Sequence, residues 1–564
     1  MRRFLTGALL FGGLLALVDV QAQDGSAALD RLIEALSSND VNTRRDAAYD
    51  LKQLGANAKA AVPALTRALE DRDPQVWFES VQALARIGPD AAPAASVLVE
   101  GLGNRDEQRR YRSAFALGSI GPAAIGHLKE SLRSDSSTVR TEAARALGFM
   151  GEAAAPAIDD LVCRLADESS SVREQAADAL GRIGDSSEPA LALVLENASP
   201  TVRAAAAEAL RQIGPQSPET LKSLVSLLED EDADVRAAAV GALAASTMDR
   251  DRLVPLIADS LRDEAKPARD AAIAGLLRLG PAASQAVPVL VEMLASGDGQ
   301  ARSAAAFTLG RIGPAARSAL PALIDALARQ PEGDNSVSNA LGRMGTAAVP
   351  ALLAAADSGS LSPERAAAAL SEIGPLAARP LVEALNRDSA GIRAAAAQAL
   401  GGIHPLPRVG FDPLVSRLSD DAPPVRAAAA GALARYGEAA RPAAEALAAA
   451  TRDPEPAVRG AAVFALATVG LAADELRPVL KAALQDAVLS VRVRAAEALA
   501  ASGERAKSYL DELAAAVSDA DPSVRQIAAR TLGGIGPDAR AAVPVLVTAL
   551  SDPDAGVRAR AAEA

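Results

Sequence analysis

The chain repeats one short pattern: an apolar residue, an arginine, a run of small residues, a leucine and then a glycine. It reads VRTEAARALGFMG at 139–151, VREQAADALGRIG at 172–184 and VRQIAARTLGGIG at 524–536. Counted from the arginine, apolar or alanine residues fall at −1, +3, +6, +7 and +10, which is one face of an α-helix. The pattern therefore predicts an amphipathic helix in every copy.

The residue at the arginine position, here called the anchor, sets the period of the repeat. Seventeen anchors lie 33 residues apart in most cases and 29 to 32 apart in the others. Trp77, Asp334 and Pro363 stand where fourteen units have arginine. The arginine anchors are Arg44, Arg110, Arg140, Arg173, Arg203, Arg236, Arg269, Arg302, Arg393, Arg426, Arg459, Arg492, Arg525 and Arg558.

Residues that start and stop helices bound the helix that carries the anchor. An N-cap oxygen precedes proline at Asp73-Pro74, Ser199-Pro200 and Asp521-Pro522. Glycine at +11 predicts a left-handed C-cap, and proline follows it at Gly88, Gly121, Gly214, Gly313 and Gly536. Another apolar helix comes next, as in AVPALTRALED at 61–71. Each unit therefore has a first helix and a second, anchor-bearing helix.

Short amphipathic helices in this order bury their apolar faces only when neighbouring units stack. We predict an all-α, right-handed α-solenoid of the armadillo/HEAT type, with about 17 two-helix repeats of about 33 residues. The period also suits ankyrin and tetratricopeptide repeats. Ankyrin units need one histidine each, and tetratricopeptide units need tryptophan and tyrosine. The chain has only two histidines, one tryptophan and four tyrosines.

The repeat resembles the HEAT repeat, in the short, alanine-rich form of phycobilin-lyase-like (PBS lyase HEAT-like) proteins, over residues 26–564. The resemblance implies a ladder between neighbouring units, which the anchor arginine and an aspartate in the preceding turn form. The aspartates that lie six residues before an arginine anchor and take this role are Asp230, Asp263, Asp453, Asp486, Asp519 and Asp552. The alternative for them is a plain solvated turn.

Three segments depart from the regular repeat. Residues 1–22 have a basic start, an apolar run and small residues before a cleavage point, which predicts a secretory signal peptide; an uncleaved anchor is the alternative. Units 1–9 then occupy 23–328, irregular repeats 329–375, and units 12–17 376–564. The irregular segment, where the anchor shifts to Arg365, is either a hinge or drift in a tolerant repeat. The last unit stops six residues past Arg558, so the chain is a fragment or its last helix frays.

The few aromatic residues gather near the start of the repeats. Tyr49, Phe78, Tyr111, Phe115 and Phe149 fall off the core face of the second helix, which lines the concave side in HEAT proteins. We expect these rings to form an exposed stripe. The charged residues expected at its rim are Arg45, Glu79, Arg86, Arg112 and Arg145. The alternatives are that some rings pack between units as core, or that they cover an end of the stack. Trp77 either packs where the arginine stem would lie or joins the stripe.

Composition removes several kinds of function. The net charge of −13 disfavours nucleic-acid binding. The His-Glu pairs by which deoxyhypusine hydroxylase, a similar repeat protein, holds iron do not occur, because Leu128 follows His127 and Pro405 follows His404. Cys163 is expected in the core and His404 at a helix end. We expect no catalytic residue, no metal and no cofactor. Alternating acidic residues at Asp230, Asp232 and Asp234 suit N-capping as well as calcium.

These observations predict an exported, non-catalytic scaffold that binds a protein or peptide on its concave face. We expect a monomer, located in the periplasm or secreted, with no membrane span once the signal is removed. The binding residues of this hypothesis are Tyr49, Trp77, Phe78, Tyr111, Phe115, Phe149, Arg112 and Arg145. One alternative is an enzyme related to phycobilin lyases or deoxyhypusine hydroxylase. Another is a spacer without a specific partner.

Overall fold

A computed structural model describes residues 22–197, 199–296, 299–331 and 334–564. All regular elements in these ranges are α-helices or short 3-10 helices, as expected for an α-solenoid. The predicted signal peptide falls almost entirely on residues 1–21, outside the described part. The chain divides into two compact units, Met1–Arg278 and Leu279–Ala564. The irregular segment 329–375 lies inside the second unit.

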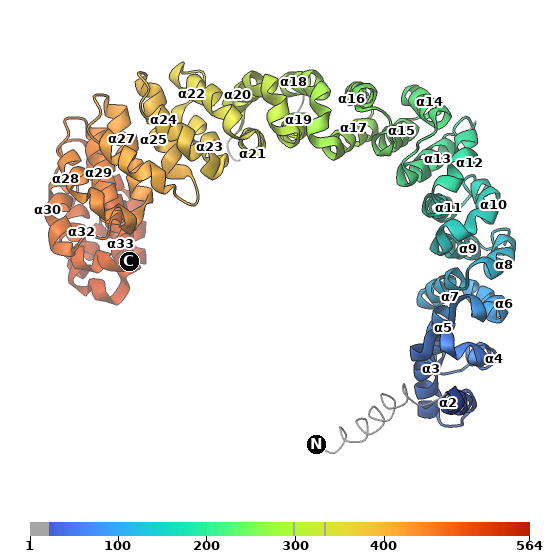
Figure 1. Ribbon diagram of the computed structural model, residues 1–564. Helices are drawn as coiled ribbons and strands as arrows, with labels where there is room; N and C mark the ends of the chain where they lie inside the picture. The colour runs from blue at the N-terminus through green and yellow to red at the C-terminus, as the bar shows by residue number, and fades with distance from the viewer. Residues whose placement is uncertain (1–21, 198, 297–298, 332–333) are drawn as a thin grey trace. The chain divides into compact units, whose positions relative to one another are not determined.

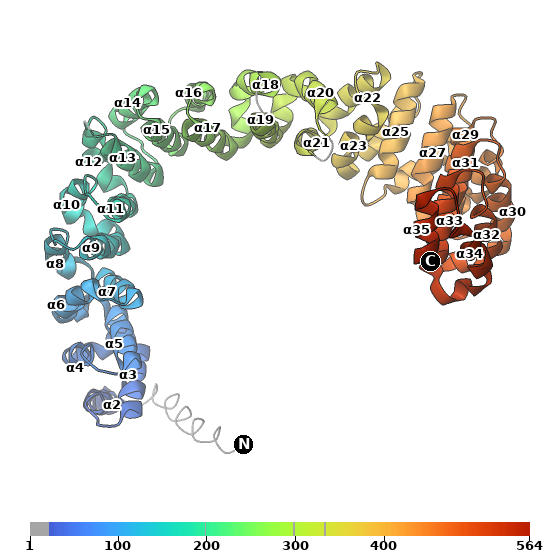
Figure 2. The same ribbon diagram turned by 180° about the vertical axis from the view of Figure 1, so that it is seen from behind.

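The first unit alternates first and second helices as the pattern predicts (Figure 1). Its first helices are α2 (Ala22–Ala35), α4 (Val62–Ala68), α6 (Ala95–Glu100), α8 (Ile125–Ser131), α10 (Ile158–Arg164), α12 (Glu188–Val194), α14 (Pro218–Ser226) and α16 (Arg250–Asp259). Its second helices are α3 (Val41–Leu54), α5 (Pro74–Ile87), α7 (Glu107–Ile120), α9 (Ser137–Met150), α11 (Ser170–Ile183), α13 (Pro200–Ile213), α15 (Ala233–Ala245) and α17 (Lys266–Leu279). Within this unit the second helices form one row and the first helices another (Figures 1 and 2).

The second unit continues the alternation. Its first helices are α18 (Val287–Ser296), α20 (Leu320–Arg329), α22 (Val349–Asp357), α24 (Ala378–Ala384), α26 (Phe411–Arg417), α28 (Ala444–Ala450), α30 (Ala473–Leu484), α32 (Leu510–Ala516) and α34 (Val543–Ala549). Its second helices are α19 (Gly299–Ile312), α21 (Ser336–Arg343), α23 (Pro363–Glu372), α25 (Ala390–Gly402), α27 (Pro423–Arg435), α29 (Pro456–Thr468), α31 (Leu489–Ala501), α33 (Pro522–Ile535) and α35 (Ala555–Glu563).

The core face assigned from the repeat pattern is buried. In α11 the residues at −1, +3, +6, +7 and +10 are at most 3% exposed: Val172, Ala176, Ala179, Leu180 and Ile183. Small alanines dominate this face, so successive second helices approach closely and each repeat is covered by its neighbours. The apolar spacing therefore set both the helix and the side it buries.

The predicted helix ends are largely confirmed, with one difference. Gly88 has φ 74° and ψ −134°, whereas Gly214 has φ 76° and ψ 72°. Gly214 is left-handed helical, as predicted. The prediction is wrong for Gly88, Gly121 and Gly536, which have ψ between −134° and −143° and adopt a mirror-image extended conformation that other residues avoid. At the N-terminal ends, Asp73 accepts hydrogen bonds from the amides of Gln75 and Val76. Asp521 caps α33 in the same way, but the Ser199 side chain makes no capping hydrogen bond.

All six aspartates expected in the ladder pair with an anchor arginine, and the partner is the anchor of the previous unit, 27 residues earlier. Arg236 donates from Nε and Nη2 to the two carboxylate oxygens of Asp263, both at 2.7 Å. The bond from Arg236 lowers the pKa of Asp263. The six confirmed rungs are Arg203–Asp230, Arg236–Asp263, Arg426–Asp453, Arg459–Asp486, Arg492–Asp519 and Arg525–Asp552. Three more were not predicted: Arg44–Asp71, Arg140–Asp167 and Arg393–Asp420.

Each aspartate of the ladder also closes its own turn. Asp230 accepts the amide of Asp232 two residues on, and its carbonyl accepts Nη1 of the next anchor, Arg236. One residue thus joins three elements: the previous second helix, the turn and the following second helix. Asp232 in turn caps α15 by accepting the amides of Asp234 and Val235. These bonds favour the capping interpretation of this acidic run.

Four other anchors form the hydrogen bonds to backbone carbonyls but no bidentate pair with an aspartate of the described residues. Each donates Nη1 to the carbonyls six and five residues before it: Arg110, Arg173, Arg269 and Arg558. In the irregular segment Arg365 instead donates to the carbonyls of Leu327 and Ala328, at the end of α20. The shifted anchor therefore ties its helix to an earlier repeat.

Residues 266–295 have the length and hydropathy of a membrane span. They comprise α17 and α18, joined by a 3-10 helix at Gly280–Ala286 in which Gly280 has φ 55°. Leu276 and Leu290 are fully buried in the repeats. Each α-helix is shorter than the roughly 20 residues that cross a bilayer, so these are core helices of the solenoid.

Candidate partner-binding surface

The exposed rings of the first unit lie on four consecutive second helices, α3, α5, α7 and α9. Tyr49, Tyr111 and Phe115 are 45%, 42% and 49% exposed, although their neighbours on the same helices are buried. Phe78 and Phe149 are half-buried. We call these five residues the aromatic stripe. Within this unit the second helices α3, α5, α7 and α9 form the row on the inner side of the bend (Figures 1 and 2).

Three rings of the stripe touch across two helices. The Phe149 ring lies 5.7 Å from that of Tyr111 and 5.6 Å from that of Phe115, at interplanar angles of 84° and 74°. Such edge-to-face contacts add about 0.5–1.5 kcal/mol beyond burial. The cluster therefore fixes Tyr111 and Phe115, one turn apart on α7, in defined orientations while leaving about half of each exposed.

A cation lies over four of the five rings of the stripe. Lys52 Nζ lies 4.4 Å from the Tyr49 centroid, on the same helix. Arginines of the following repeat cover three more rings: Arg112 over Phe78 at 4.1 Å, Arg145 over Tyr111 at 5.8 Å and Arg182 over Phe149 at 5.7 Å. Rings and cations thus alternate from α3 to α11, and each cation holds its ring in place.

Gly118 makes the three-ring cluster possible. A Cβ atom at this position would lie 2.5 Å from the Cβ of Phe149 and 3.2 Å from the Ala146 carbonyl. Glycine therefore lets α9 come close enough for Phe149 to reach both rings of α7. The sequence pattern contained this glycine, but only the helix packing shows what it accommodates.

Trp77 does not belong to the stripe. It is 8% exposed, and the guanidinium of Arg109 covers its ring at 4.8 Å. The indole occupies an anchor position at the edge of the core, where other units place the arginine stem. The prediction that Trp77 contacts the partner is therefore wrong. Its indole packs at the edge of the core, which was the other role considered for it.

The charged residues expected at the rim divide into paired and unpaired groups. Arg45 forms a bidentate pair with Asp73 and lowers the pKa of that carboxyl. Glu79 is buried beneath the stripe, where it pairs with Lys52. Arg86 donates to the carbonyl of Lys52. By contrast, Arg112 makes no ion pair within the part of the chain that the structure describes.

A second buried carboxylate, Glu142, lies beside Arg145, the cation over the Tyr111 ring. Its oxygens are 3.1 Å from Arg145 Nε and 3.8 Å from Arg110 Nε, but the geometry leaves Oε2 without a hydrogen bond. Burial raises the pKa of Glu142, and the two arginines oppose that shift. Glu79 and Glu142 are therefore both engaged by cations of the protein itself.

The isolated candidates for chemistry remain apart. Cys163 is exposed, not in the core, because Leu161 and Leu165 define the buried face of α10 and Cys163 lies on the other side. His404 lies in a turn just after α25, as expected. In the described residues no group of three histidine, cysteine or acidic side chains could hold a metal ion.

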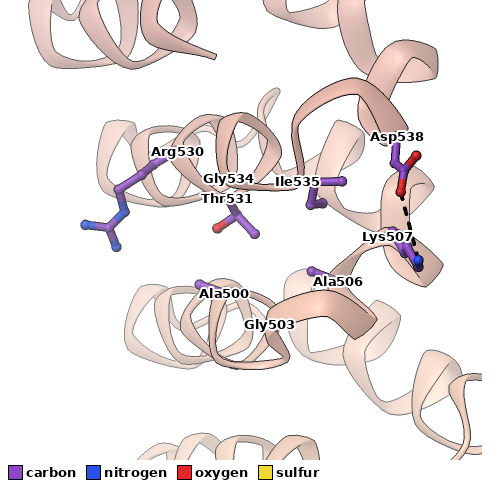
Figure 3. Close-up of a pocket in the computed structure, with 9 residues that line it drawn as sticks. All are labelled: Ala500, Gly503, Ala506, Lys507, Arg530, Thr531, Gly534, Ile535 and Asp538. Carbon is purple, nitrogen blue, oxygen red and sulfur yellow. Dashed lines mark ion pairs between the residues drawn. The ribbon is translucent and has the colours of Figure 1, made fainter. Parts of the chain in front are cut away.

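An open recess of about 540 Å³ lies between α31 and α33 of the second unit (Figure 3). Small residues at Ala500, Gly503 and Gly534 create it. Lys507 pairs with Asp538 at 3.9 Å on one side, and Arg530 extends on the other (Figure 3). The charged groups do not converge on a common point, so the recess does not form a constellation for acid–base chemistry.

Comparison with known families assigns the chain. Its repeats match the family described as HEAT repeats at residues 29–118, 95–181, 158–244, 221–306, 287–372, 378–450, 443–516 and 510–564. The protein is therefore a member of the HEAT-repeat family. This confirms the resemblance at family level. Comparison with curated proteins returned no match.

Solved structures with a similar course of the chain include the karyopherin Kap121p and Kap95p. Kap121p bound to Nup53p is 14% identical, with a TM-score of 0.44, and covers 95% of this chain and 74% of its own. The karyopherin Kap121p bound to the SUMO protease Ulp1p is 15% identical, with a TM-score of 0.43 and the same coverage. A structure of Kap95p with RanGDP is 15% identical, with a TM-score of 0.41. The match covers 95% of this chain and 86% of the Kap95p chain. At these values the likeness describes the repeated helical fold alone.

Proposed function

We propose that this HEAT-repeat protein is a scaffold that binds a segment of a protein partner through the aromatic stripe. The observation that carries the proposal is the run of exposed rings on consecutive second helices, three of them about half exposed yet oriented by ring and cation contacts. Rigid, partly exposed aromatic groups beside arginines are typical of binding hot spots. Recognition by such a surface requires no catalytic residue.

The test compares partner capture by the full chain with capture by two five-residue alanine variants. The stripe variant changes Tyr49, Phe78, Tyr111, Phe115 and Phe149. The control variant changes five exposed apolar residues elsewhere: Leu193, Leu376, Val409, Val543 and Val547. Both remove similar exposed apolar area, so both should retain the helical circular dichroism of the parent.

We expect a partner from an envelope extract to be held by the parent and the control variant and lost by the stripe variant. Purified partner should then bind the stripe variant at least tenfold more weakly. Equal retention on all three proteins, or on none, would contradict the proposal and favour a spacer without a specific partner.

The form of the protein that meets this partner is also a proposal. We propose export after removal of residues 1–22, action as a monomer, and membership of the short, PBS lyase-like subgroup of HEAT repeats. The apolar N-terminal segment supports the first, and the 33-residue spacing supports the last. Determination of the N-terminal residue of the cell-derived protein, together with its sedimentation, tests the first two.

A further inference from the structure

The stripe has a spacing that limits what can bind it. Its rings lie on successive second helices, and packed helices are about 8–10 Å apart. A polyproline II segment has three residues per turn and rises about 9 Å per turn, so it presents one side chain per helix of the row. An α-helical ligand repeats its apolar positions about every 5 Å along its axis and would not keep this register.

The hydrogen-bonding groups at the stripe also favour a polyproline II ligand. The carboxylates Glu79 and Glu142 are buried and engaged by Lys52, Arg110 and Arg145. The hydroxyls of Tyr49 and Tyr111 donate to no described residue. From α5 to α9 the surface therefore offers donors and few acceptors, and the carboxylates of Asp46 and Asp50 lie at its α3 end. A proline-bearing segment is a matching ligand, since proline has a carbonyl acceptor but no N–H.

A β-strand fits this surface less well. Strand addition needs unpaired backbone groups at a sheet edge, and the helices of the row satisfy their own. The backbone of a polyproline II segment has no internal hydrogen bonds and remains solvated, so it docks through side chains and a few carbonyls. Aromatic-lined grooves are the usual receptors for such segments.

The charge of the row favours an acidic ligand. Helices α3, α5, α7 and α9 together contain eight arginines and one lysine against three glutamates and two aspartates, in a chain whose net charge is −13. Two of the three glutamates are buried. Arg112, half-buried over Phe78, makes no ion pair with any residue that the structure describes and remains available to a carboxylate.

We propose that the partner segment is an acidic, proline-bearing chain in the polyproline II conformation that runs along the stripe across α3 to α9. Prolines at a three-residue spacing pack against Tyr49, Phe78 and the cluster of Tyr111, Phe115 and Phe149. A carboxylate of the segment pairs with Arg112. This inference rests on the proposed function, because it names the chemistry of the ligand for the same surface.

The experiment measures binding of labelled synthetic peptides to the full chain by fluorescence anisotropy. The probe is (Pro-Pro-Glu)5, about 45 Å long in the polyproline II conformation. Two controls have the same length: (Pro-Pro-Lys)5, and an acidic amphipathic peptide that forms an α-helix. The protein variants are Tyr111→Ala/Phe115→Ala, Arg112→Gln, and Leu193→Ala/Leu376→Ala as the control for exposed apolar residues.

We expect (Pro-Pro-Glu)5 to bind at least tenfold more tightly than (Pro-Pro-Lys)5. The Tyr111→Ala/Phe115→Ala variant should lose at least tenfold in affinity, and the control variant should lose none. Arg112→Gln should reduce the preference for the acidic probe by threefold to tenfold. Unchanged helical circular dichroism of all variants excludes misfolding as the cause.

Three results would overturn the inference. They are no preference for (Pro-Pro-Glu)5 over the basic probe, equal binding of (Pro-Pro-Glu)5 to the ring variant, and stripe-dependent binding of the helical peptide alone. The last leaves the proposed function standing, because the stripe still binds a protein segment. If partner capture is also independent of the stripe, the proposed function fails as well.

Discussion

Two sets of second helices show how one repeat serves two purposes. In the second unit, α27, α29, α31 and α33 have an anchor arginine each, and all four anchors form bidentate rungs with aspartates 27 residues on. In the first unit, α5 has Trp77 as its anchor and α7 has Arg110, whose nearest carboxylate is Glu142 at 3.8 Å. Four rings of the stripe lie on α5, α7 and α9, whereas the four helices of the second unit have one phenylalanine, Phe464.

The core face is the same in both sets, so the difference lies at the edge and on the inner surface. Phe464 has Arg494 of the next repeat 5.7 Å from its ring, and Phe307 has Arg343 at 5.1 Å. A ring under an arginine is therefore a general device of this repeat. What distinguishes the first unit is the continuity of rings over consecutive helices, where the ladder is incomplete.

Acidification should have the largest effect, because it acts on many rungs together. Pairing with arginine lowers the pKa of Asp263, Asp453 and Asp486 below that of the unfolded chain, which is about 3.9. Below that value the unfolded state binds more protons, so the stability from the rungs is complete above about pH 4 and is lost as pH falls towards the folded pKa. Urea unfolding at pH 7, 5 and 3.5 should show a falling midpoint.

The control for this effect is Asp453→Asn/Asp486→Asn. Asparagine keeps the turn but does not titrate, so the midpoint of this variant should start lower at pH 7 and fall less steeply with acid. A slope identical to that of the parent would show that groups outside the ladder govern acid unfolding.

Loss of a single rung is the next largest effect. Asp420 accepts both Nε and Nη2 of Arg393, and its side chain is only 2% exposed. Asp420→Ala leaves the guanidinium partly buried without its partner and should cost about 3 kcal/mol in the free energy of unfolding. Asp421→Ala, at the exposed neighbouring residue, should change stability by less than about 0.5 kcal/mol. Urea unfolding measures both variants. Similar losses of stability in the two would show that the Arg393–Asp420 pair is not the cause.

Much of this fold was predictable because the repeat multiplies a weak signal. The spacing of Val172, Ala176 and Leu180 assigned the buried face correctly, and the same spacing recurs in most units. The ladder followed from the resemblance, but three rungs were missed. Asp71 precedes Trp77 and so had no arginine to mark it; Asp167 and Asp420 had the required spacing and were overlooked. The ψ angle of Gly88 could not be predicted, since a glycine at a helix end has more than one conformation available.

The surface was less predictable because it depends on contacts between repeats. The positions of Tyr111 and Phe115 off the core face indicated exposure, and the structure confirms it. The cations over Phe78 and Tyr111 are Arg112 and Arg145, each 34 residues further on. That spacing was present in the sequence, and a search for arginine one repeat after each ring would have found it. The burial of Trp77 depends on how its edge of the core is packed, which composition does not determine.

The three-ring cluster should be sensitive to a single methyl group. Gly118→Ala places a Cβ atom 2.5 Å from that of Phe149, so α9 must shift and the ring contacts must change. We expect a loss of about 1 to 3 kcal/mol in the free energy of unfolding. The matched control is Gly431→Ala in α27, where an added Cβ meets nothing within 4 Å. Higher helix propensity should stabilise that variant by up to about 1 kcal/mol.

Opposite signs for the two glycine variants would establish that close approach, and not helix propensity, decides the outcome at Gly118. A stabilised Gly118→Ala variant would show that the helices adjust freely there. In that case the orientation of Phe149 would not be fixed by the repeat spacing. Urea unfolding and the near-ultraviolet circular dichroism of the aromatic rings distinguish these outcomes.

The smallest effect should come from installing the missing rung in the first unit. Ser134 lies six residues before the anchor Arg140, and its side chain accepts the amide of Ser136 while its carbonyl accepts Arg140 Nη1. Asp230 makes the same two contacts in a complete rung. Ser134→Asp should therefore bring a carboxylate within reach of Arg110 and stabilise the chain by about 1 kcal/mol. Asn104→Asp is the control. Asn104 also occupies the aspartate position, but the anchor 27 residues before it is Trp77 and not an arginine. If both variants are stabilised equally, the gain comes from the aspartate closing its own turn. If only Ser134→Asp is stabilised, the gain comes from the ion pair with Arg110.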